Sequence, residues 1–175
     1  MIETERLILR AYREEDRPDF AALHGDERVG RWLGGTLDRA GSDALLDRLN
    51  AHITQHGWGA WAVERKSDGR LIGMTGLAPV NEVLPVGPAI EIEWRFIPEA
   101  WGEGYATEAA RVVLAWAFAN LDQDEILAFT ADTNLASQGV MRKIGMVADP
   151  ARDFDHPRLA ADHPLNRHVV YTARR

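Results

Sequence analysis

The amino-acid sequence predicts a mixed α/β fold, in which helices cover one central sheet. Residues 90–96 alternate apolar and charged side chains, which is the period of a β-strand. After a short loop with two glycines, residues 105–120 carry an apolar stripe at helical spacing. Strand and helix patterns follow one another in the order β-α-α-β-β-β-α-β-α-β, which is typical of a layered α/β protein.

The N-terminal part of the chain predicts one strand and two helices. Residues 6–12 alternate in the manner of a strand. Asp16 can cap a short helix that tolerates Pro18 in its first turn. Ser42 can cap the next helix, whose apolar side chains recur at helical spacing. This apolar stripe consists of Leu45, Leu46, Leu49 and Ile53.

Two further strands are expected before residue 90. Residues 58–65 and 70–77 should form a hairpin, because the turn sequence Lys66-Ser67-Asp68-Gly69 separates them. Residues 78–88 contain three prolines and predict a loop.

The C-terminal part predicts a strand, a helix and a last strand. Residues 125–131 are largely apolar and should form a strand that is buried on both faces. Asn134 opens a helix, and Gly145 can end it in a left-handed conformation. Residues 149–166 form a polar tail rich in proline and histidine, and residues 167–172 can form a strand.

Length and composition limit the class of protein. The 175-residue chain is 46% apolar and 27% charged, as an ordinary globular protein is, and we expect a single domain over residues 1–175. A net charge of −7 argues against nucleic acid as a partner and is compatible with a cationic amine. The absence of cysteine excludes disulfides and thiolate metal sites. No apolar run approaches about 20 residues, so we expect a cytoplasmic protein with no membrane partner.

The segment with the most chemical information is Trp101-Gly102-Glu103-Gly104-Tyr105-Ala106. Here a strand leads through a glycine loop into a long helix. Gly102 and Gly104 allow unusual dihedral angles and a close approach of the backbone to a ligand. The free N–H groups at a helix start attract an anion such as a pyrophosphate. The alternative is that the two glycines only form a tight turn.

Two common nucleotide-binding motifs do not match this segment. A Rossmann site needs a third glycine, where Thr107 stands, and lies near the first strand of its sheet. A P-loop needs Gly-Lys-Ser/Thr, which is absent.

The glycine segment resembles the acetyl-CoA pyrophosphate motif of the GNAT acetyltransferases, Gln/Arg-x-x-Gly-x-Gly/Ala, with Trp101 where Gln or Arg usually stands. A second family signature is Asn-x-x-Ala/Ser, followed by a glycine and an apolar residue. It resembles the positions Asn134, Ser137, Gly145 and Met146 of this sequence. The opening Thr4-Glu5-Arg6-Leu7-Ile8-Leu9-Arg10 and residues 98–109 resemble the branch that contains the ribosomal-protein alanine acetyltransferases (RimJ/RimL type). The resemblance covers nearly the whole chain up to about residue 147.

The resemblance implies an α+β GNAT fold, with a mixed, mostly antiparallel sheet that splays open between the strands at 90–97 and 125–131. The pantetheine arm of acetyl-CoA, the expected co-substrate, would lie in that gap. The Asn134 side chain would reach the arm, although a simple N-cap is its alternative role. The implied cofactor-binding residues are Phe96, Ile97, Trp101, Gly102, Glu103, Gly104, Tyr105, Ala106, Thr107, Asn134 and Ser137.

The implied reaction is direct attack of a neutral primary amine on the thioester through a tetrahedral intermediate. An amine is mostly protonated at neutral pH, so a base must accept its proton. Glu91 and Glu93 share one face of the strand at 90–96 and are the candidates, and Glu91 matches the family carboxylate better. The alternative is a solvated face on which both carboxylates pair with Arg95.

The intermediate also needs a donor for its oxyanion, and a backbone N–H near Ile97 is the expected source. The leaving thiolate needs a proton. Many family members use a tyrosine at the position of Met141, so Ser137 is the expected substitute, and its alternative role is a helix-start residue. Tyr105 and Tyr171 are weaker candidates.

No metal site is expected, because His156, His163 and His168 are irregularly spaced among prolines. The acceptor amine is a protein N-terminus or a small molecule, and a homodimer is possible. Two alternatives stay open: a catalytically inactive acyl-CoA sensor on the same fold, and an unrelated α/β scaffold with no CoA affinity.

Overall fold

The computed structural model describes all residues from 1 to 175, and they form two compact units. The first unit comprises Met1–Gly76 and Glu93–Val112, and the second comprises Leu77–Ile92 and Val113–Arg175. Three elements, β4 (Leu71–Val80), β5 (Ala89–Phe96) and α4 (Tyr105–Asn120), run from one unit into the other. The expectation of a single domain stays a prediction.

The sheet of the first unit is antiparallel. Strands β1 (Ile2–Glu3), β2 (Leu7–Arg10) and β3 (Ala60–Arg65) precede β4 and then β5 in the strand order. The pairs β1–β2, β2–β3 and β3–β4 are antiparallel, with a bulge after Val63. Along the β4–β5 contact, Ile97 N–H donates to Ile72 O at 2.9 Å and Thr75 Oγ1 donates to Glu93 O at 2.9 Å.

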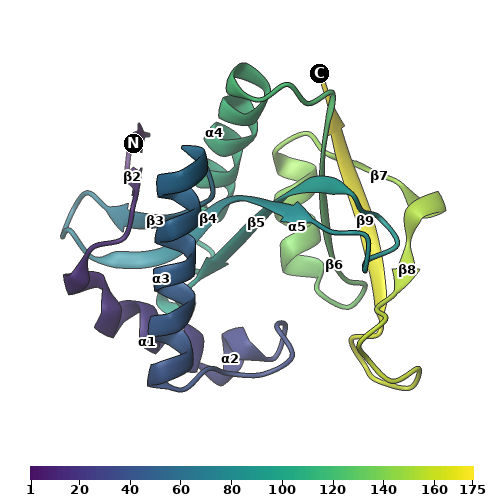
Figure 1. Cartoon of the computed structure of the whole chain (residues 1–175), viewed down its shortest axis with the longest axis horizontal. Coiled ribbons are helices and arrows are strands. Elements are labelled where there is room, and N and C mark those ends of the chain that lie inside the picture. Colours follow the sequence, from purple (N-terminus) through teal and green to yellow (C-terminus); the bar gives the residue numbers. More distant parts are fainter. The chain divides into compact units, whose positions relative to one another are not determined.

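Four helical segments follow β2. They are η1 (Glu14–Asp16), α1 (Arg17–Gly25), α2 (Glu27–Gly30) and α3 (Arg39–His56). Figure 1 shows α1 and α3 side by side. The core of this unit consists of buried apolar residues from these helices and from the strands. Removing such side chains from water is the main stabilising contribution to folding. These core residues include Leu7, Leu9, Phe20, Leu23, Leu46, Val63, Ile72 and Met74.

The start of α3 differs from the sequence prediction. Asp38, rather than Ser42, is the N-cap, and its side chain accepts a hydrogen bond from the Gly41 N–H at 2.7 Å. Ser42 lies inside the first turn and is fully buried, with no hydrogen-bond partner for its hydroxyl. Aspartate and serine are both favoured caps, so local sequence could not choose between them.

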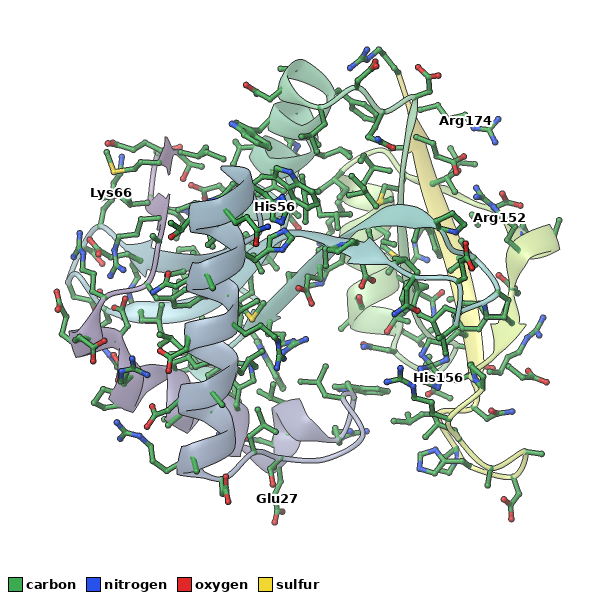
Figure 2. The ribbon with its side chains drawn as sticks, in the orientation of Figure 1. Glu27, His56, Lys66, Arg152, His156 and Arg174 are labelled. Carbon is green, nitrogen blue, oxygen red and sulfur yellow. The ribbon has the colours of Figure 1, made fainter.

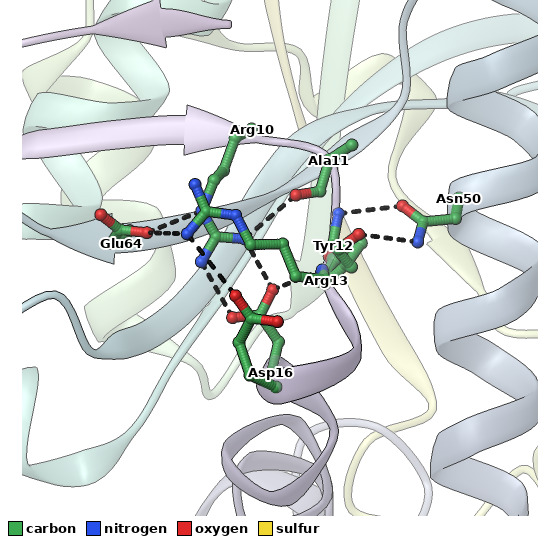
Figure 3. A network of polar contacts seen from close by, with 8 residues as sticks. Arg10, Ala11, Tyr12, Arg13, Asp16, Asn50 and Glu64 are labelled. Carbon is green, nitrogen blue, oxygen red and sulfur yellow. Dashed lines mark hydrogen bonds and ion pairs between the residues drawn. The ribbon is translucent and has the colours of Figure 1, made fainter.

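A buried ionic network joins β2 to the start of α1 (Figure 3). The Arg10 guanidinium donates to Asp16 at 2.6 and 2.9 Å and to Glu64 at 2.7 Å. Asp16 also accepts from the Arg13 N–H at 2.7 Å. Burial alone would raise the pKa of Asp16, but the hydrogen bonds from Arg10 and Arg13 hold that pKa below its ordinary value. Asp16 is therefore engaged by this network instead of capping α1 with its side chain.

The main strand pair of the second unit is β6 (Glu125–Ala131) with β9 (Arg167–Arg174). The strand β6 pairs along its whole length with the antiparallel β9, and Figure 1 shows the two adjacent. Its contact with the parallel β5 is a single pair, Glu91 with Leu127. The short strands β7 (Val147–Ala148) and β8 (Phe154–Asp155) both pair with β9.

One cluster of buried apolar residues in the second unit lies around β6 and β9, and it consists of Val80, Val86, Leu127, Phe154 and Val170. At one end of the two strands, Glu125 accepts from Arg152 at 2.7 and 3.0 Å and from Arg174 at 3.0 Å. Both arginines are labelled in Figure 2. Their hydrogen bonds, that of Arg152 first, lower the pKa of Glu125. They tie η3 (Pro150–Arg152) to the sheet.

The predicted α/β class with a mixed, mostly antiparallel sheet is confirmed, and so are the bounds of α4 and β6. The helix α5 (Leu135–Lys143) begins after Asn134 and is followed by the left-handed Gly145, as expected. The loop predicted for residues 78–88 begins late, because β4 continues to Val80. No helix is both long enough and apolar enough to span a bilayer.

The buried network generates a stability prediction. Asp16→Asn should lower the free energy of unfolding by about 3 kcal/mol, because it removes one charge of a buried ion pair. Glu14→Gln is the matched control, since Glu14 also binds an arginine through two hydrogen bonds but is 82% exposed. Its cost should be much smaller, because water screens an exposed ion pair. Urea unfolding measures both values, and an equal cost for the two variants would contradict the importance of burial.

Candidate functional site

The glycine loop joins η2 (Pro98–Ala100) to α4 in the first unit. Gly102 and Gly104 have φ angles of +80° and +83°, a region that side chains with a Cβ rarely occupy. The first hydrogen bond of the helix runs from the Glu108 N–H to Gly104 O at 3.0 Å. The N–H groups that precede it have no partner within the helix, so this end of α4 attracts an anion.

A carboxylate in the first turn of α4 fastens the loop to the N-terminal segment. Glu108 accepts from the Thr4 hydroxyl at 2.5 Å, from the Arg6 N–H at 3.0 Å and from Arg6 Nε at 2.7 Å. Burial raises the pKa of Glu108, but these hydrogen bonds from Thr4 and Arg6 outweigh it and lower that pKa. We call these three residues the Glu108 clamp.

Arg6 also reaches the loop itself. Its Nη1 donates to Glu103 O at 3.0 Å, and its guanidinium lies 4.4 Å from the centre of the Tyr105 ring. The clamp therefore connects two segments that the sequence analysis treated only as separate family signatures. Spacing along the chain could not show that they meet.

Trp101 lies where the family usually has Gln or Arg, and its side chain is partly held. The indole Nε1–H donates to Phe96 O at 2.8 Å, although the residue is 47% exposed. The Ile97 N–H is used by the strand pairing to Ile72. This particular N–H therefore already has an acceptor, and the expectation of an oxyanion donor among the backbone N–H groups near Ile97 stays a prediction.

The two candidate bases have different surroundings. Glu93 forms an ion pair with Arg95 at 3.1 Å, and both side chains are about one-fifth exposed, at 21% and 22%. This is the pairing that the sequence analysis gave as the alternative role of this residue. Glu91 lies two residues earlier on β5, in the part of that strand that pairs with β6.

A buried histidine that the sequence analysis missed contacts the arginine of this ion pair. His24 of α1 is 2% exposed, and its Nε2 lies 3.1 Å from Arg95 Nη1. Its Nδ1 lies 3.0 Å from Phe20 O, one helical turn away. Burial is the main cause that lowers the pKa of His24 to about 4; the hydrogen bond to Phe20 O raises this pKa, and the nearby Arg95 charge lowers it. The spacing of Phe20, Leu23 and His24 on one helix face is the signal that could have placed it inside.

Tyr12, also in the first unit, has a buried hydroxyl group. This hydroxyl has no hydrogen-bond partner, while the backbone N–H and C=O of Tyr12 are both bound by the Asn50 side chain (Figure 3). Burial, and then the charge of Glu93, raise the pKa of Tyr12 well above its ordinary value. The phenol is therefore neutral and keeps its proton for donation.

The remaining candidates belong to the second unit. Asn134 is the N-cap of α5, and its side chain accepts from the Ser137 N–H at 3.3 Å and donates to Thr130 at 3.0 Å. Its alternative role as a cap is therefore present in the structure. Met141, in place of the family tyrosine, is 1% exposed and belongs to the core.

Tyr171, a weaker candidate acid, is also buried, and its hydroxyl is already engaged. It accepts from Arg142 at 3.0 Å and donates to Gln138 at 3.4 Å.

The three C-terminal histidines contact neighbouring rings or backbone groups. The rings of His156, in the tail, and His168, on β9, have centroids 5.1 Å apart, and Phe154 stacks on His168 at 5.3 Å. Figure 2 labels His156 in this part of the second unit. His163 Nδ1 accepts from the Leu165 N–H at 3.1 Å.

Comparisons with known proteins agree on one family. Residues 6–147 match the model described as "Acetyltransferase (GNAT) domain". YoaA of Bacillus subtilis, described as an uncharacterized N-acetyltransferase, is 28% identical over 147 residues, which is 83% of this chain and 81% of that protein.

Solved structures share the fold. A GNAT-family acetyltransferase from Bacillus anthracis matches with a TM-score of 0.82 and 21% identity, over 99% of this chain and 97% of that chain. The spermidine N-acetyltransferase from Vibrio cholerae, solved with CoA and spermine, has a TM-score of 0.75 and 19% identity, over 98% and 96% of the two chains.

The buried His24 generates a pH prediction. The unfolded chain binds a proton at His24 below about pH 6.5, whereas the folded chain does so only near a pKa of about 4. The stability contributed by neutral His24 is therefore present above about pH 6.5 and is lost as the pH falls toward 4, by about 3 kcal/mol.

His24→Gln should remove this pH dependence, which urea unfolding at several pH values between 4 and 7 measures. A variant of the exposed His56 to Gln should keep the native dependence. Identical pH curves for the native protein and His24→Gln would contradict the burial of a neutral histidine.

Proposed function

The chain belongs to the GNAT acetyltransferase family, and on that premise we propose that this acyltransferase moves the acetyl group of acetyl-CoA to a primary amine. The observation that supports the proposal most strongly is the clamped glycine loop at the start of α4. Two left-handed glycines and a first helical turn present several N–H groups to solvent, which suits a pyrophosphate. The spermidine acetyltransferase of the same fold was solved with CoA and spermine.

The proposed cofactor-binding residues come from three segments of the chain. In the first unit, the N–H groups of Gly102 to Ala106 would hold the pyrophosphate, with Trp101, Glu103 and Thr107 beside it. Phe96 and Ile97 would offer backbone groups to the pantetheine arm. The Phe96 carbonyl already accepts from Trp101 and has a second lone pair for this purpose. Asn134 and Ser137, at the start of α5, are proposed to bind pantetheine, as the family resemblance implies.

The residues of this chain must supply three functions to the reaction. A base accepts the proton of the attacking amine, and we propose Glu91, because it matches the family carboxylate better than Glu93 does. A donor to the oxyanion is needed, and we propose a backbone N–H near Ile97 other than that of Ile97 itself, which donates to Ile72 O. A proton must reach the leaving thiolate, and Ser137 is the proposed source, since Met141 has none to give.

The finer assignments are part of the same proposal. We propose one catalytic domain over residues 1–175, a place in the ribosomal-protein acetyltransferase (RimJ/RimL) branch, a cytoplasmic location and a possible homodimer. The acceptor is a protein N-terminus or a small-molecule amine.

A second candidate is an acyl-CoA sensor without catalysis, which the buried Met141 in place of the family tyrosine favours. A sensor binds acetyl-CoA and releases no thiol with any amine.

Gly104→Glu tests the cofactor site. The glutamate adds bulk and negative charge to the loop and should weaken acetyl-CoA binding at least about 100-fold, by the loss of a charged anion contact. Gly69→Glu is the matched control, since Gly69 also has a positive φ, of +70°, but lies in the β3–β4 turn. Each variant should lose about 1–2 kcal/mol of stability from the left-handed backbone. Calorimetric titration measures the affinity, and equal affinities in the two variants would overturn this site.

Glu91→Gln tests the base. The variant should keep its affinity for acetyl-CoA and lose about 100-fold in kcat, which is the usual contribution of a general base. The release of free thiol in the presence of amines measures kcat. An unchanged kcat in Glu91→Gln, together with a large loss in Glu93→Gln, would move the role to Glu93.

A further inference from the structure

The His24–Arg95–Glu93 chain of contacts fixes a charged side chain at the surface of β5. Arg95 can only donate hydrogen bonds. His24 Nε2 must therefore accept from Arg95 Nη1 at 3.1 Å, and Nδ1–H donates to Phe20 O at 3.0 Å. Both ring nitrogens are thus assigned. A histidine in this state is neutral, so it orients the guanidinium without cancelling or repelling its charge.

The guanidinium keeps donors for a ligand. It carries five N–H groups, and these contacts use one on each terminal nitrogen, toward His24 and toward Glu93. The Arg95 side chain is 22% exposed, so an incoming group can reach it. Because His24 already orients the Arg95 side chain, binding of a ligand to Arg95 costs little side-chain entropy.

The two charges beside each other select a particular kind of amine. Glu93 presents a negative charge, and Arg95 presents a positive charge 3.1 Å away. An acceptor with an ammonium and a carboxylate matches both. A polyamine carries only positive charges, so one of its ammonium groups would be repelled by Arg95.

We infer that Arg95, positioned by His24, binds a carboxylate of the acceptor, and that the acceptor is a small molecule with a carboxylate close to its primary amine, as in an α-amino acid. This inference rests on the proposed acetyl transfer and selects among its acceptors. Peptide N-termini lack the neighbouring carboxylate and should be poor acceptors.

The experiment measures thiol release from acetyl-CoA with four kinds of acceptor: the standard α-amino acids, their carboxamides, short peptides and spermidine. The carboxamides keep the amine and remove the carboxylate. For the best amino acid, kcat/KM should exceed that of its carboxamide by about 10- to 100-fold, the value of one charge-assisted hydrogen-bonded pair. A ratio near one, or a preference for spermidine or peptides, overturns the inference.

Variants then test whether Arg95 causes the preference for the amino acid over its carboxamide. Arg95→Gln should bring the acid-to-amide ratio close to one, and Arg95→Lys should keep part of it. His24→Gln should raise KM for the amino acid more than it lowers kcat. Arg70→Gln is the matched control, an arginine that is 55% exposed on another part of the unit, and it should keep the native ratio. An unchanged ratio in a folded Arg95→Gln overturns the assignment.

Acetyl-CoA titration of each protein distinguishes a failure of the acceptor inference from a failure of the proposed function. A native protein that binds acetyl-CoA and acetylates amines without regard to the carboxylate contradicts only the acceptor inference. A native protein that releases no thiol with any acceptor contradicts the proposed function and the inference with it. Where Arg95→Gln fails to bind acetyl-CoA, the ratio in the native protein and in Arg95→Lys decides.

Discussion

The glycine loop depends on one carboxylate. Glu108 gathers the Thr4 hydroxyl and two donors of Arg6, and Arg6 in turn holds the Glu103 carbonyl of the loop. Loops whose glycines adopt positive φ angles have many accessible conformations when unconstrained. The hydrogen bonds of the clamp restrict these conformations. A preordered anion site binds with less loss of entropy than one that must form around its ligand.

The first unit places its buried charges in networks whose members satisfy one another. Arg10 is shared by Asp16 and Glu64, and Arg95 is shared by His24 and Glu93. In both cases the arginine connects the sheet to the N-terminal helical segments. The difference is exposure: the Arg10 network is buried and structural, whereas the Arg95 network reaches the surface. That difference is why we assign ligand contact to one and stability to the other.

The sequence predicted the parts of the fold that periodicity encodes. The helix at 105–120 and the strand at 125–131 were found with their bounds, because each has one unbroken pattern. Ser42 was misassigned as the cap of α3, since Asp38, four residues earlier, is an equally favoured cap. Likewise, the motif located Gly102 and Gly104, but neither the Glu108 clamp nor the buried His24 can be found from spacing alone.

The most direct test of the clamp is the affinity of Glu108→Gln for acetyl-CoA, measured by calorimetric titration beside the native protein. The substitution keeps the shape of the side chain and removes a negative charge next to the proposed anion site. Electrostatics alone would then tighten binding. Our account predicts the opposite, a Kd weaker by about tenfold, because the loop loses its anchor. An unchanged or tighter Kd in a folded variant would contradict it.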